Sequence, residues 1–331
     1  MLLNLHTHLE GRVRPGTAAE LAEQLGLPHP EQGWADAVEL DGPATLTSYL
    51  EKVSSTYPFF AHPEALIRIA REAVEDAAAD GQAYLELRFG PATHVRDGFD
   101  LSAVIAAVCE GVEQGRQSAG IAAGVVVAAL RLHDSDQNDA VARAAVSFAG
   151  RGVVGFDLAG DEARFPELAP FASAFAIARA GGLGLTCHAA EAGPGSAAVE
   201  AVELFGVTRI GHGAHIVDDP DSLEQIADRG VVVEVCPTSN WYTGAIGAIA
   251  EHPAPRFRDS GVAVVLGDDN PRQTLSPLSS EARILSDRLG FGAAGIAEVA
   301  RTSIRAGFMT ESDRADLTVR LAHAEGESLR R

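Results

Sequence analysis

Residues 2–8 read Leu-Leu-Asn-Leu-His-Thr-His, a short apolar run that ends in two histidines spaced two residues apart. Alternate residues of a β-strand point to the same side, so His6 and His8 are expected to face one direction together. Paired imidazoles are an unusual choice for packing in a core, whereas two imidazoles that converge on a metal are not. This stretch therefore predicts a strand that ends at a cavity. Segments elsewhere in the sequence must form the other walls of that cavity.

Further apolar runs of strand length follow along the chain. Several are nearly continuous in Val, Ile and Leu, as expected for strands that are buried on both faces. The predicted strands are Leu2–His8, Ala83–Phe89, Ala123–Leu130, Val153–Ala159, Gly184–His188, Thr208–His212, Val231–Cys236 and Val262–Gly267. Ala-rich segments of helical periodicity separate most of them. This alternation predicts an α/β fold, a (β/α)8 TIM barrel.

The segment between the first two predicted strands is too long for one crossover helix, since it runs from about residue 9 to 82. We expect extra helices inserted there, after strand one and over the barrel mouth. No repeat, low-complexity tract or linker interrupts the sequence. Residues 1–331 are therefore expected to form a single domain.

The composition limits the classes of partner. The formal net charge of −20 opposes binding to phosphate backbones and anionic membranes, so we expect a small-molecule ligand, with no nucleic acid and no membrane. Cys109, Cys187 and Cys236 lie in apolar runs, which indicates buried free thiols and a cytoplasmic setting. The N-terminus has no signal-peptide pattern, and nothing in the sequence specifies an oligomeric state.

Polar residues end several of the predicted strands, and the C-terminal ends of the strands form the face where active sites of this fold are built. His6, His8, His188 and Asp268 together offer three nitrogens and one oxygen. That set suits one zinc ion with a position left for water. The only lysine, Lys52, lies in the first insertion and not at a strand end, which argues against a second metal bridged by a carboxylated lysine.

A hydrolytic site also needs a group that moves protons. Glu191 lies three residues beyond His188, just past the predicted strand, and is the candidate general acid and base. A hydrogen-bonded core histidine and a solvated loop carboxylate are the non-catalytic alternatives for residues of these types.

Seven stretches, in the same order along the chain, resemble the adenosine deaminase family. They are LHTHLEG (5–11), YLELRFGP (84–91), VVGFDLAGDE (153–162), HAAEAG (188–193), RIGHGAH (209–215), VEVCPTSN (233–240) and GDDNP (267–271). The resemblance implies an amidohydrolase-type barrel and hydrolytic deamination of an aminopurine nucleoside such as adenosine, which yields the 6-oxo product and ammonia.

The resemblance also implies a role for each matching residue. It implies one zinc per subunit on His6, His8, His188 and Asp268, with His8 also bordering the substrate. Glu191 would protonate ring N1 while activated water attacks C6, and His212 would orient that water. Asp269 would contact N7 and the Gly160 amide would contact N3. Because N7 can only accept a hydrogen bond, Asp269 would have to be a protonated donor in the substrate complex, with a raised pKa there. The segment Thr45–Tyr57 resembles a lid helix, whose Tyr49, Leu50 and Val53 fit the pocket or the core equally well.

Several departures fall on positions that would meet the substrate. Glu10 stands where adenosine-specific members carry Asp against the ribose 5′-hydroxyl, and it resembles the adenine and aminodeoxyfutalosine branches. The other departures are Ala190, Gly267, an apparently inserted Asn270, and the loop 272–281, which lacks an aromatic residue. The alternative substrates are therefore free adenine, aminodeoxyfutalosine or another modified aminopurine. Another single-metal hydrolase of this fold and a non-catalytic purine-binding protein are the remaining alternatives.

Overall fold

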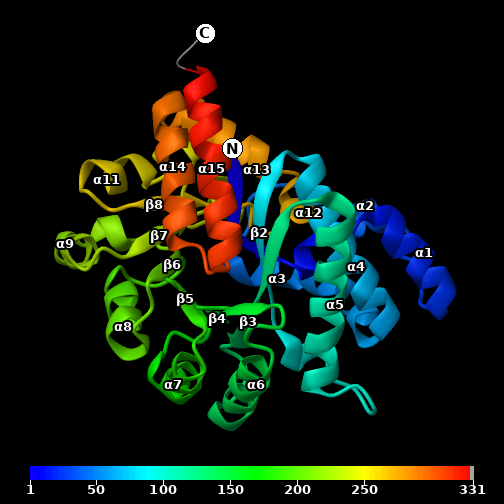
Figure 1. Ribbon diagram of the computed structural model, residues 1–331. Coiled ribbons are helices and arrows are strands. Elements are labelled where there is room, and N and C mark those ends of the chain that lie inside the picture. The colour runs from blue at the N-terminus through cyan, green and yellow to red at the C-terminus, as the bar shows by residue number, and fades with distance from the viewer. Residues whose placement is uncertain (329–331) are drawn as a thin grey trace.

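The computed structural model describes residues 1–328 and contains the predicted barrel (Figure 1). Its parallel strands are hydrogen-bonded in chain order from β1 to β8. The strands are β1 Leu2–His8, β2 Gln82–Phe89, β3 Ala122–Leu130, β4 Val153–Ala159, β5 Gly184–Ala189, β6 Arg209–His212, β7 Val232–Val235 and β8 Val264–Leu266. Each predicted strand is confirmed to within two residues. The last three residues of the expected domain 1–331 lie outside the described part of the chain.

The ring of strands is completed just beyond β8. The Asp269 amide donates to the His6 carbonyl at 3.0 Å, and the His8 amide donates to the Asp269 carbonyl at 2.8 Å. The backbone of Asp269 therefore pairs with β1 and brings the chain after β8 to the histidines of the first strand.

Helices cover the outside of the barrel and fill the long first insertion. The insertion contains α1 Pro15–Leu25, α2 Trp34–Val38, α3 Leu46–Val53 and α4 Pro63–Ala79, which confirms the expected extra helices. The later helices are α5 Leu101–Ala119, α6 Ser135–Ser147, α7 Ala172–Ala180, α8 Ser196–Phe205, α9 Pro220–Asp228, α10 Pro237–Tyr242, α11 Ala254–Asp259, α12 Pro271–Thr274, α13 Leu278–Arg283, α14 Gly292–Ala306 and α15 Glu311–Ser328.

Two glycines of α5 allow a close contact with α4. A Cβ atom at Gly111 of α5 would lie 2.3 Å from the Ile67 carbonyl oxygen of α4, and one at Gly115 would lie 2.6 Å from the Val74 Cβ. The two helices can approach this closely only because both positions lack a side chain. The apolar faces of both helices are buried in the main core, which also holds Val125 and Val127 of β3.

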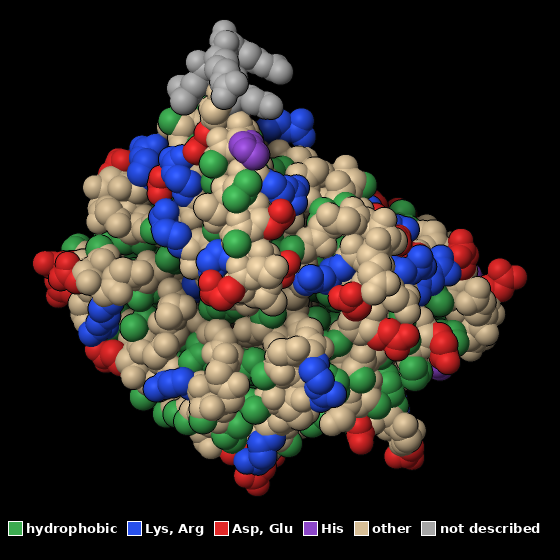
Figure 2. All heavy atoms as spheres, viewed as in Figure 1, with side chains coloured by type: hydrophobic (Ala, Val, Ile, Leu, Met, Phe, Trp, Pro, Cys, Tyr) green, Lys and Arg blue, Asp and Glu red, His purple; other side chains and the backbone are tan. Residues whose placement is uncertain are grey.

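The C-terminal helices α14 and α15 lie side by side and cover one side of the barrel near the N-terminus (Figure 1). They bury Ile304 and Leu317 in a second apolar cluster with Leu3 and Leu5 of β1. On the face shown in Figure 2, acidic and arginine side chains are interspersed instead of forming one basic patch. Within residues 1–328, no helix has the length and apolarity needed to cross a membrane.

Candidate active site

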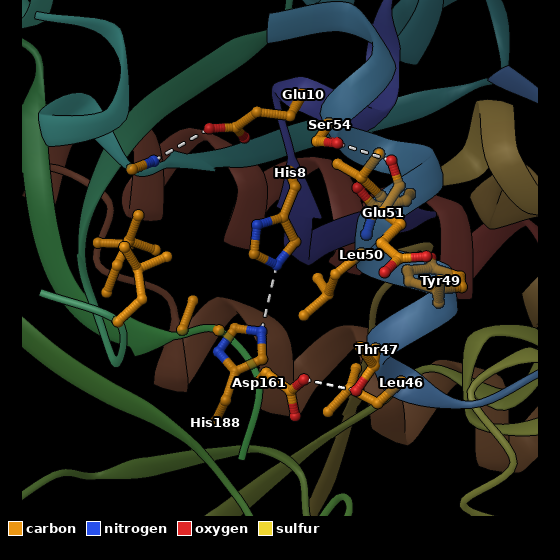
Figure 3. Close-up of a pocket in the computed structure, with 18 of the residues that line it drawn as sticks. His8, Glu10, Leu46, Thr47, Tyr49, Leu50, Glu51, Ser54, Asp161 and His188 are labelled. Atoms are coloured by element: carbon orange, nitrogen blue, oxygen red, sulfur yellow. Dashed lines mark hydrogen bonds between the residues drawn. The ribbon is translucent and has the colours of Figure 1, made fainter. Parts of the chain in front are cut away.

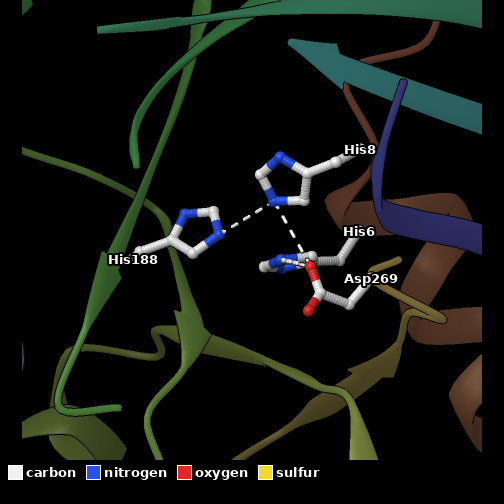
Figure 4. Close-up of side chains that lie close together, drawn as sticks. All are labelled: His6, His8, His188 and Asp269. Atoms are coloured by element: carbon white, nitrogen blue, oxygen red, sulfur yellow. Dashed lines mark hydrogen bonds and ion pairs between the residues drawn. The ribbon is translucent and has the colours of Figure 1, made fainter. Parts of the chain in front are cut away.

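Three histidines and one aspartate converge at the C-terminal ends of the strands (Figure 4). His6 and His8 come from β1, His188 from β5 and Asp269 from the segment after β8, and their ligand atoms lie within 4.8 Å of one another. His8 Nε2 lies 3.2 Å from His188 Nε2, and Asp269 Oδ1 lies 3.6 Å from His6 Nε2. His6 Nε2 is buried without a hydrogen-bond partner. This set offers three imidazole nitrogens and one carboxylate oxygen, and it leaves the buried His6 Nε2 free to bind an ion. It fits a single zinc-type ion.

The structure corrects the expected fourth member of this cluster. Asp268 points away from the histidines, and both of its carboxylate oxygens accept hydrogen bonds from Arg12 Nη2, at 2.8 and 2.6 Å. The ion pair with Arg12 holds Asp268 outside the cavity, and the left-handed backbone at Asp269 directs the next carboxylate to the histidines. The prediction of Asp268 as a ligand is wrong by one residue, and Asp269 occupies that position.

Because Asp269 takes the place expected for Asp268, its expected role as a hydrogen-bond donor to the substrate changes too. Its carboxylate accepts hydrogen bonds from Tyr49 Oη at 3.0 Å, Ser239 Oγ at 2.5 Å and Asn270 Nδ2 at 2.9 Å. Burial opposes its ionisation, but the close approach of His6 and the nearby charges of His8 and His212 hold the pKa of Asp269 well below its usual value. Asp269 therefore accepts hydrogen bonds from three side chains and is not placed as the donor to N7 that the resemblance implies.

Two buried carboxylates orient the rings of His6 and His188. His6 Nδ1 lies 2.7 Å from Glu234 Oε2, and His188 Nδ1 lies 3.0 Å from Asp157 Oδ2. Such partners fix the tautomer of a metal-binding histidine and leave its Nε2 free for the ion. Arg88 lies between the two carboxylates and donates to Asp157 at 3.0 Å and to Glu234 at 2.9 Å. Asp157 and Glu234 are not among the predicted site residues, although each is a lone acid in an apolar strand.

The proton-transfer candidates lie beside the cluster. Glu191 is buried, and its Oε2 is 3.8 Å from His212 Nε2. Burial, followed by the negative charges of Asp269 and Glu162, raises the pKa of Glu191 well above its usual value, which favours the protonated carboxyl. Burial lowers the pKa of His212 well below its usual value, which keeps the ring neutral. Asn240 Nδ2 donates to His212 Nδ1 at 3.1 Å, so Nε2 carries the proton and faces Glu191.

Backbone strain is concentrated in this site. Ala190, His212 and Asp269 have φ values of 55°, 63° and 54°, in the left-handed region that residues other than glycine seldom adopt. Such conformations persist only where the surrounding structure enforces them, and they cluster at functional sites. Each of the three adjoins or contributes a candidate site residue.

A cavity of about 570 Å³ opens over these groups (Figure 3). Helix α3 of the first insertion forms one wall, and Tyr49, Leu50 and Val53 all border the cavity, as the lid interpretation predicts. Thr47 Oγ1 donates to Asp161 Oδ2 at 2.6 Å, which fastens α3 to the segment after β4. Gly160 lies on the same wall as Asp161.

Glu10 lies on the cavity wall beyond the cluster. Its Oε1 accepts from the Gly90 amide at 3.1 Å and lies 3.2 Å from His94 Nε2, whereas Oε2 is buried without a partner. Asn270 also borders the cavity, and its Oδ1 is buried and unpartnered. Buried polar atoms without partners are rare, so both oxygens are candidates for contacts with a ligand.

A TIM barrel that gathers three histidines, an aspartate and a buried glutamate at its strand ends belongs to the class of metal-dependent hydrolases. The family model of adenosine deaminase matches residues 2–324, and the chain belongs to that family. It is an adenosine deaminase-like aminohydrolase.

Individual relatives agree with this assignment. An adenosine deaminase from Enterococcus faecalis is 36% identical over 283 residues, which cover 84% of this chain and 83% of that protein. The crystal structure of an adenine deaminase from Arthrobacter aurescens superposes with a TM-score of 0.88 at 25% identity, covering 98% of this chain and 99% of the other. An amidohydrolase from Burkholderia ambifaria, solved with bound zinc, gives a TM-score of 0.88 at 27% identity, covering 98% and 90%.

Proposed function

We propose that this protein hydrolyses the 6-amino group of adenosine or a related aminopurine nucleoside and releases the 6-oxo product and ammonia. The observation that carries this proposal is the buried Glu191, which shares one cavity with the histidine and aspartate cluster. Water adds to C6, the C6–N bond breaks, and the amino group leaves as ammonia. The reaction therefore needs an activated water and a proton donor in one enclosed space.

The residues that would hold one zinc ion are His6, His8, His188 and Asp269. When bound, the metal activates water for attack at a ring carbon. The zinc-containing structural relative supports this choice of ion. Glu234 and Asp157 keep Nδ1 of His6 and of His188 occupied, so that Nε2 of each ring faces the ion.

Glu191 acts as the acid. Its protonated carboxyl donates to ring N1, which makes C6 more electrophilic, and it can take up a proton from the water and pass one to the leaving amine. The neutral His212 donates from Nε2 and orients the attacking water on the side of Glu191. Both residues lie in the wall of the cavity.

The remaining contacts hold the purine. The Gly160 amide is proposed to meet N3, and His8 borders the ring. Because Asp269 is committed to the cluster, the N7 contact passes to Asn270, whose neutral Nδ2 can donate without a change of protonation. Glu10 offers its free Oε2 to a hydroxyl or N–H donor on the part of the substrate away from the reacting carbon.

A modified aminopurine is the second candidate substrate, and the outer cavity wall favours it. Leu132 borders the cavity and is 59% exposed, and Phe165 and Leu46 also border the cavity, so several large apolar side chains line it. Arg164 is the only arginine or lysine in that lining. These groups suit an aminopurine with an extended substituent, such as aminodeoxyfutalosine, better than free adenine.

The three free cysteines support the expected cytoplasmic setting.

The test is an ammonia-release assay on zinc-loaded protein with adenosine, deoxyadenosine, adenine and a panel of 5′- and N9-modified aminopurines. Glu191→Gln is the blank. Glu191-dependent turnover of adenosine supports the first candidate, and turnover of an extended aminopurine alone supports the second. Hydrolysis of another substrate class without ammonia would replace both with a different single-metal hydrolase. Purine binding without turnover would point to a non-catalytic protein.

A further inference from the structure

One carboxylate outside the ligand set holds the segment that carries Glu191. Glu162 follows β4, and its Oε1 accepts a hydrogen bond from the Ala190 amide at 2.9 Å. Its Oε2 accepts from the amides of Glu191 and Ala192, both at 2.9 Å. The Glu162 side chain is only 3% exposed. Three consecutive backbone amides thus converge on a single buried side chain.

This convergence requires an unusual backbone. Ala190 has a φ of 55°, and a left-handed residue within a short segment turns successive N–H groups toward one point, which forms an anion-binding concavity. Glycine at position 193 leaves room for this carboxylate, since a Cβ there would lie 2.7 Å from Glu162 Oε1 and would push it from its place. Arg131 reinforces the arrangement by donating to the His188 carbonyl at 2.9 Å, with its Nη2 3.8 Å from Glu162 Oε1.

We propose that Glu162 is a positioning residue for the proton donor: by accepting the amides of Ala190, Glu191 and Ala192, it fixes where the Glu191 side chain enters the cavity. A neutral side chain cannot replace it fully, because an amide presents only one acceptor oxygen to three donors. This inference rests on the proposed acid role of Glu191.

The negative charge of Glu162 also supports the proton-donor role of Glu191, because it raises the pKa of Glu191. Burial, Asp269 and Glu162 raise the pKa of Glu191, whereas Thr243 and Arg131 lower it. His212 also faces the carboxyl. Removing the Glu162 charge should therefore lower the pKa of Glu191 and decrease the fraction of protonated Glu191 at alkaline pH.

The experiment compares Glu162→Gln with Glu167→Gln, which removes one exposed carboxylate nearby that has no hydrogen bond to residues 190–192. For Glu162→Gln we expect kcat to fall by about 10- to 100-fold with little change in KM. The alkaline limb of the kcat profile should move to lower pH. Amides 190–192 should exchange hydrogen at least about tenfold faster. The control should resemble the wild type in all three measurements.

Amide exchange is measured without substrate, so a failure of this inference can be told apart from a failure of the proposed function. Unchanged exchange at residues 190–192, or an unchanged pH profile with unchanged kcat, would overturn the positioning role. If Glu162→Gln does not fold, Glu162→Asp keeps the charge but shortens the reach. That variant should then lose kcat while its alkaline limb stays in place, and a retained kcat would overturn the proposal.

Discussion

Arg12 Nη2 donates to both carboxylate oxygens of Asp268, at 2.8 and 2.6 Å, and so turns this carboxylate away from the histidine cluster. The Arg12 and Asp268 side chains are 5% and 0% exposed, so this ion pair is fully buried. The pair holds the segment after β8 against the short turn Glu10–Arg12 that follows β1. It thereby sets which of two adjacent aspartates enters the cavity.

Substitution of the two aspartates by asparagine should therefore have different consequences. Asp269→Asn should lower zinc affinity by at least about 100-fold, because an uncharged amide replaces a ligand carboxylate. Asp268→Asn should retain the metal but lower the free energy of unfolding by about 3 kcal/mol, because it leaves a buried guanidinium unpaired. Metal content by mass spectrometry and urea unfolding measure the two effects. The reverse pattern would restore Asp268 as the ligand.

Arg88 should control metal affinity without touching the metal. It is fully buried and joins Asp157 and Glu234, the carboxylates that orient His188 and His6. For Arg88→Lys we expect zinc affinity, measured by chelator competition, to fall by about 10- to 100-fold, because one ammonium cannot hold both carboxylates. The matched control is Arg272→Lys, which alters a half-exposed arginine paired with Asp76. Equal affinities in the two variants would refute the link.

The sequence was sufficient to predict the barrel and most of the cluster, for identifiable reasons. Apolar runs mark strands buried on both faces, and two-residue spacing puts His6 and His8 on one side. The aspartate was misassigned because β8 is only three residues long and is followed by a left-handed residue. The alternation of side-chain directions along a strand cannot be extended through such a bend to decide which aspartate faces the cavity.

Other site residues depend on contacts between distant segments. Glu234 stands in the apolar run VVVEV, and a lone acid in a buried strand was a readable signal of a polar partner. In contrast, His252 contacts Asn240, which orients His212, and nothing local in the sequence links these three residues. The same holds for Glu162, whose partners become neighbours only when β4 and β5 are aligned.

Glu281 should make stability depend on pH. Burial raises the pKa of Glu281 to about 7, despite hydrogen bonds from Ser276 and Thr238. A carboxyl whose pKa is higher in the folded than in the unfolded protein contributes its full stabilisation at a pH below the unfolded-state pKa. This contribution is lost as the pH rises through the folded-state pKa of about 7. The loss amounts to about 3 kcal/mol. Glu281→Gln should therefore flatten the change in unfolding free energy between about pH 5 and pH 8, measured in urea. The exposed Glu31→Gln should keep the wild-type slope, and equal slopes in all three proteins would contradict the assignment.

Glu10 should determine which substituents the substrate carries. Its Oε1 is held by the Gly90 amide and His94, and its buried Oε2 is free to accept a hydrogen bond from a substrate hydroxyl. Glu10→Gln presents an amide in place of that carboxylate, so KM for adenosine should rise by about 10- to 100-fold while kcat changes little. The internal control is 5′-deoxyadenosine, which lacks the hydroxyl. The wild type should discriminate against it, and the variant should treat the two nucleosides nearly alike. If the variant keeps the wild-type discrimination, the 5′-hydroxyl is recognised elsewhere, and the contact of Glu10 belongs to a different substituent.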